Sequence, residues 1–117
     1  MERSCQDILI VLVTASGSEE ARRIAEAVVK GRHAACANII PAIQSIYWWQ
    51  GKLADDQESM VIFKTTASRL ESAETAIRAV HSYKVPEILA IPVHAGLGSY
   101  LEWLRHETQA RVNEASS

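Results

Sequence analysis

The feature that most constrains the fold of this chain is a run of six consecutive apolar residues near its start, from Ile8 to Val13. The run is short, rich in β-branched residues and closed by Ala15-Ser16-Gly17-Ser18, which is typical of a strand that ends in a turn. A strand with one solvated face alternates apolar and polar side chains, whereas this one is apolar at every position. We therefore expect both faces of this strand to be covered.

Helical and strand periodicities alternate along the rest of the chain. The predicted order is a strand over residues 8–14, a helix over 18–32, long strands over 34–50 and 52–66, a helix over 68–80, a strand over 88–93 and a helix over 99–108. The two long strands meet at a turn around Gly51 and form a β-hairpin. Pro41 and Pro92 mark their strands as bulged or as sheet edges, because proline cannot donate a ladder hydrogen bond.

The order β-α-β-β-α-β followed by a C-terminal helix is that of a ferredoxin-like α+β sandwich. In this fold two helices cover one face of a four-stranded antiparallel sheet. A chain of 117 residues fits one domain. We expect a polar lead-in over residues 1–7, a single domain over 8–108 and a polar tail over 109–117.

The second face of such a sheet needs a cover that the two helices do not provide. One solution is that the C-terminal helix folds back over it. The other is a second copy of the chain, and we favour it because the helix is short and the hairpin long. The hairpin also carries Tyr47, Trp48 and Trp49 near its tip, and aromatic clusters at such positions commonly anchor interfaces. We expect a homo-oligomer with these three residues in its interface.

Composition argues against several classes of function. The formal net charge is −2, whereas nucleic-acid binders need a basic face. No apolar run approaches the roughly 20 residues that span a membrane, so no membrane partner is expected. The cysteines, Cys5 and Cys36, are too few for a disulfide framework, and without a visible targeting segment we expect a cytoplasmic protein with reduced thiols. G-x-S-x-G, Walker and H-E-x-x-H motifs do not occur in the sequence, and no catalytic residue is predicted.

Five segments resemble the CutA family of divalent-cation tolerance proteins, in the family's order and spacing from about Ile8 to His106. These segments are residues 34–41 (AACANIIP), 45–52 (SIYWWQGK), 63–66 (FKTT), 83–87 (YKVPE) and 100–104 (YLEWL). The resemblance implies ferredoxin-like subunits in a compact cytoplasmic homotrimer, similar in architecture to PII signalling proteins. It also implies a non-catalytic role in tolerance of copper and other divalent metal ions.

The resemblance further implies positions for a copper site. The family's proposed cysteine ligand falls on Val13 and its histidine pair on Val80 and His81, so this chain retains only His81. Tight binding needs three or four convergent ligands, so one imidazole is insufficient. Cys36 is a further candidate, as a soft ligand for Cu(I), although free cysteines most often act as small buried hydrophobes. The candidate metal ligands are therefore Cys36 and His81, for copper or another divalent ion.

The returning arm of the hairpin is acidic. Asp55, Asp56 and Glu58 can hold a divalent ion weakly, but acidic turns are more commonly only solvated. We therefore expect these three carboxylates to be exposed to water.

Trp49, Lys64, Tyr83 and Glu87 form a second candidate site. If the hairpin and the loop over 83–87 converge across a subunit boundary, these residues line a cleft with a cation, a carboxylate and aromatic walls. Clefts of this kind commonly bind small ligands, and the chain would then be a small-ligand sensor or signalling module. The alternative is an inter-subunit salt bridge between Lys64 and Glu87, with the aromatic residues filling the interface.

Overall fold

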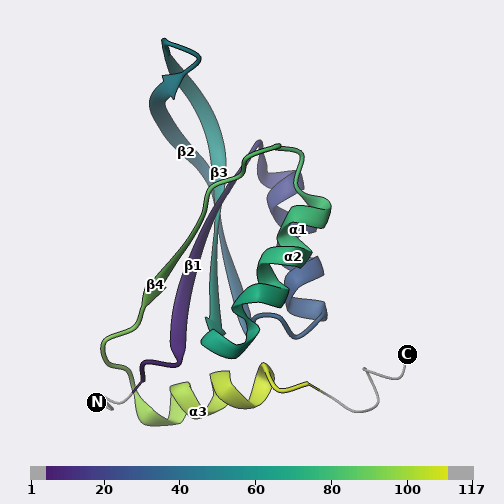
Figure 1. Ribbon diagram of the computed structural model, residues 1–117, viewed down its shortest axis with the longest axis vertical. Helices are drawn as coiled ribbons and strands as arrows, with labels where there is room; N and C mark the ends of the chain where they lie inside the picture. The colour runs from purple at the N-terminus through teal and green to yellow at the C-terminus, as the bar shows by residue number, and fades with distance from the viewer. Residues whose placement is uncertain (1–4, 111–117) are drawn as a thin grey trace.

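A four-stranded antiparallel sheet in the order β2-β3-β1-β4 forms the centre of the protein (Figure 1). The computed structural model describes residues 5–110. Its elements are β1 (Ile8–Ala15), α1 (Ser18–Lys30), β2 (Cys36–Trp49), β3 (Lys52–Thr66), a 3-10 turn (Ala67–Arg69), α2 (Leu70–Val80), β4 (Ile88–Pro92) and α3 (Gly98–Glu107). The predicted order of strands and helices is confirmed, with bounds that differ by a few residues.

The hairpin of β2 and β3 extends well beyond the helices (Figure 1). Its last pair joins Trp49 to Lys52, and the turn between them has positive φ at Gln50 (51°) and Gly51 (78°). Positive φ at both central residues is typical of the two-residue turns whose twist matches that of the strands. The predicted irregularity at Pro41 is confirmed, because the register shifts between Ile40 and Ile43 and β2 is an edge strand.

The main core lies between the sheet and the helices α1 and α2, which cover one of its faces (Figure 1). Alternate residues of β1 and β3 point toward the helices, as the period of a strand requires. The fully buried members of this core include Val11, Val13, Ala15, Ala21, Ile24, Val28, Ala34, Val61, Phe63 and Ile77. Of the helices in residues 5–110, none combines the length and apolar character that a membrane crossing requires.

A second, smaller core joins α3 to one end of the sheet. Ile8 packs there with Leu101 and Leu104 and with Cys5. We expected the residues before β1 to form a polar lead-in, and for Cys5 this is wrong: its side chain is fully buried, and Sγ donates to the carbonyl of Val93 at 3.1 Å. A small apolar thiol fits this position because the neighbouring side chains of α3, Leu101 and Leu104, are apolar and exclude water.

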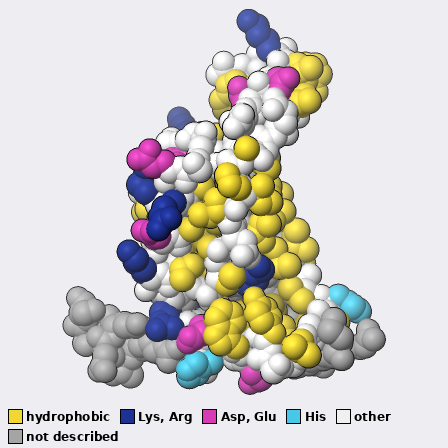
Figure 2. Space-filling model, turned by 180° about the vertical axis from the view of Figure 1, so that it is seen from behind, with side chains coloured by type: hydrophobic (Ala, Val, Ile, Leu, Met, Phe, Trp, Pro, Cys, Tyr) yellow, Lys and Arg dark blue, Asp and Glu magenta, His cyan; other side chains and the backbone are white. Residues whose placement is uncertain are grey.

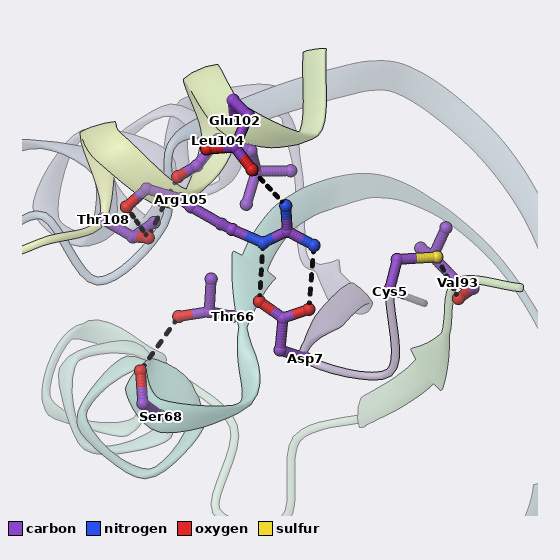
Figure 3. Close-up of polar contacts among 9 residues, drawn as sticks. All are labelled: Cys5, Asp7, Thr66, Ser68, Val93, Glu102, Leu104, Arg105 and Thr108. Atoms are coloured by element: carbon purple, nitrogen blue, oxygen red, sulfur yellow. Dashed lines mark hydrogen bonds and ion pairs between the residues drawn. The ribbon is translucent and has the colours of Figure 1, made fainter. Parts of the chain in front are cut away.

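Polar contacts hold α3 in place (Figure 3). The guanidinium of Arg105 donates to both carboxylate oxygens of Asp7, at 2.8 and 3.1 Å, and to Glu102 at 2.6 Å. Because the bond to Asp7 is bidentate, it fixes the direction of the helix as well as its distance from the start of β1. α3 therefore lies across one end of the sheet. The alternative, that the C-terminal helix covers the second face of the sheet, is correct only for that end.

Candidate functional site

The sheet face opposite α1 and α2 is largely apolar and only partly covered by this chain. In the strand register Leu12 is level with Ile62 on one side and Leu89 on the other, and Ile10 is level with Ile91. Leu89 is 55% exposed, and Figure 2 shows hydrophobic side chains gathered over this face in a continuous region. Soluble monomers rarely leave apolar surfaces of this extent in water. We call this surface the open face.

The hairpin tip carries the exposed aromatic residues that the sequence placed there. Trp48 is 74% exposed and Trp49 58%. Tyr47 is also exposed, and its hydroxyl donates to Asp56 at 2.7 Å. Their place in an oligomer interface stays a prediction.

A cavity of about 790 Å³ lies between the hairpin and the loop that precedes β4. Its walls include three aromatic residues, Tyr47, Trp49 and Tyr83, and three acidic residues, Asp56, Glu58 and Glu87. The structure therefore brings together Trp49, Tyr83 and Glu87 within one chain, whereas the predicted cleft lies across a subunit boundary and stays a prediction. We call this cavity the hairpin pocket. Its volume is in the range that holds small organic ligands.

Lys64 is not part of the hairpin pocket. It lies on the open face, level with Cys36 in the strand register, and its ammonium group donates to the side-chain oxygen of Asn38. The cleft with a cation is predicted across a subunit boundary, and the place of Lys64 in it stays a prediction for two subunits. The salt bridge between Lys64 and Glu87 stays a prediction for two subunits.

Tyr83 is fixed in the pocket by bonds from two directions. Its hydroxyl donates to Glu58 Oε2 at 2.7 Å, and its backbone N–H donates to His81 Nδ1 at 3.0 Å. Burial is the main cause that raises the pKa of Tyr83, and the hydrogen bond to Glu58 raises it further. The phenol therefore remains protonated and remains a donor.

His81 is buried behind Tyr83 and holds the loop to the sheet. Its Nε2 lies 2.7 Å from the carbonyl oxygen of Thr14. Because Nδ1 accepts from Tyr83, the ring proton lies on Nε2 and donates to this carbonyl. Both ring nitrogens of His81 are therefore engaged, which leaves neither available to a metal ion without a rearrangement.

Glu20, in the first turn of α1, ties the same loop to the turn after β1. Its side chain is buried, with one oxygen accepting from the backbone N–H and hydroxyl of Ser16 at 3.0 Å each. The other oxygen accepts from the backbone N–H of Ser82 at 2.8 Å. Burial raises the pKa of Glu20, but these hydrogen bonds outweigh it and lower the pKa to about 2. The ionised carboxylate thus fixes the loop that carries His81 and Tyr83 to the turn after β1.

The candidate metal ligands do not meet within one chain. Cys36 is level with Ile10 of β1 in the strand register, whereas His81 bonds to Thr14. These two positions of β1 are four residue steps apart, which is roughly 13 Å along a strand. Within residues 5–110, no group of three or more His, Cys, Asp or Glu side chains converges as a metal site would require. The donors of a single chain therefore do not fit a copper or other divalent-metal centre.

The residue that the sequence analysis missed is Glu58. We expected a solvated carboxylate, yet Glu58 is only 8% exposed, because the loop over residues 81–87 folds across it and Tyr83 bonds to it. The only available signal was its spacing of two from Asp56, which puts both carboxylates on one side of β3. Nothing in the local sequence indicates which loop covers that side.

Over residues 5–110 the fold is thus α+β, with a four-stranded antiparallel sheet and three α-helices. Residues 9–107 match the family model of the CutA1 divalent ion tolerance protein, and the chain belongs to this family. It is 46% identical to the divalent-cation tolerance protein CutA of Thermus thermophilus, over 85% of this chain and 96% of that protein. It is 41% identical to the chloroplastic protein CutA 1 of rice, over 86% of this chain but 57% of the rice protein.

A solved structure of the divalent cation tolerance protein CutA1 from T. thermophilus matches the fold with a TM-score of 0.85 at 44% identity. The match covers 87% of this chain and 99% of the T. thermophilus chain. The family assignment made from the five sequence segments is therefore confirmed. The family description and the names of the T. thermophilus relatives describe tolerance of divalent cations, and none of the names is that of an enzyme.

Proposed function

We propose that this protein is a homotrimeric, non-catalytic protein of the cytoplasm that acts in tolerance of copper and other divalent metal ions. Its subunits are ferredoxin-like and its assembly resembles that of PII proteins. The strand order β2-β3-β1-β4 supports the ferredoxin-like topology. The observation that carries the proposal is the open face, which in a lone chain leaves apolar side chains such as Leu89 and Ile91 in water.

Two further features support assembly from copies of one chain. The outer strands β2 and β4 each leave one edge without a partner in residues 5–110, and open strand edges invite pairing with another chain. The exposed Trp48 and Trp49 project on the hairpin, where they can reach a neighbouring subunit. A trimer closes the edges of all three sheets at once and buries the open faces together.

In this proposal the protein responds to divalent metal ions. Cys36 and His81 lie apart in one chain, so a site that contains both draws on more than one subunit. Soft thiolate and imidazole donors suit copper and zinc.

Light scattering on a size-exclusion column tests the assembly, with an expected mass of three times the 12.9 kDa of one chain. A stable monomer at micromolar concentration would refute it. Calorimetric titration of the same sample with Cu(II), Cu(I) and Zn(II), repeated with Cys36→Ser and His81→Ala, tests the metal ligands. A tight metal site that neither variant weakens would exclude both residues as ligands.

The hairpin pocket supports a second candidate function, that of a small-ligand sensor. The pocket gathers Trp49, Tyr83 and Glu87, and the bonds of His81 and Glu20 hold its loop against β1. A ligand that fills the pocket would contact the hairpin and this loop together. It would therefore alter the position of the aromatic arm in the assembly.

A further inference from the structure

We draw no further inference here: the strongest candidate, the exposed surface patch that the stacked rings of Tyr100 and Trp103 form on α3, is an unpartnered apolar surface, and nothing in the structure shows what covers it.

Discussion

Replacement of Glu20 by glutamine tests the reasoning about the buried loop contacts most directly. The carboxylate is 4% exposed and accepts three hydrogen bonds, two from Ser16 and one from the backbone of Ser82. Glutamine has one acceptor oxygen, so its amide nitrogen must face donors on one side. Glu20→Gln therefore removes a charge and leaves at least one buried donor without an acceptor.

The size of the effect follows from the pKa of Glu20. The hydrogen bonds lower it from 4.5 to about 2 despite burial, so the folded state prefers the ionised form by up to about 3 kcal/mol. A depressed pKa contributes stability above the unfolded value, and this contribution is lost as the pH falls from about 4.5 through about 2. At neutral pH we expect Glu20→Gln to lower the free energy of unfolding by about 3 kcal/mol.

Chemical denaturation between pH 2 and pH 7 measures both expectations, at one fixed protein concentration because an oligomer's stability depends on it. The wild type should lose more stability than Glu20→Gln between pH 4.5 and pH 2, and the two curves should converge. Glu19→Gln is the matched control, since the neighbouring carboxylate is 93% exposed. Parallel curves for wild type and Glu20→Gln, with no difference from the control, would refute the assigned role.

Three further changes test the core, the pocket and the open face. Phe63→Ala removes a fully buried ring and should lower the free energy of unfolding by about 3–5 kcal/mol in chemical denaturation. Tyr83→Phe leaves Glu58 buried without its donor and should cost about 1–3 kcal/mol, whereas Tyr47→Phe, at the exposed hairpin, should cost less than half as much. Leu89→Asp places a charge on the open face and should reduce the mass measured by light scattering; an unchanged mass would argue against assembly through this face.

The hairpin and its edges could be predicted because their signals are local. Pro41 forbids a ladder bond at its own position, so β2 had to be irregular or at an edge, and it is both. Gly51 supplies the positive φ that a tight turn requires. The apolar run over residues 8–13 predicts cover on both faces. One face packs against the helices through Val11 and Val13, and cover of the other by a second subunit stays a prediction.

The candidate site could be predicted only in part. Trp49, Tyr83 and Glu87 were grouped in a cleft between subunits, and one chain already brings them together because the hairpin and the loop before β4 both lie at the same end of the sheet. Within one chain Lys64 lies apart from these three residues, because its position along β3 puts it level with Cys36, several residues away from that end. Lys64 and Glu58 are an even number of residues apart, which places both side chains on the same side of β3. This spacing does not show that they lie at different ends of the strand.

The sequence by itself determined the order of strands and helices, the hairpin turn and the need for a second layer on the sheet. These depend on periodicity and on the conformations of proline and glycine, which act within a few residues. Only the tertiary structure decided that Cys5 is buried, that Glu58 lies beneath Tyr83 and that Glu20 joins two loops. The environment of a charge depends on which distant segment folds over it, and no local pattern carries that information.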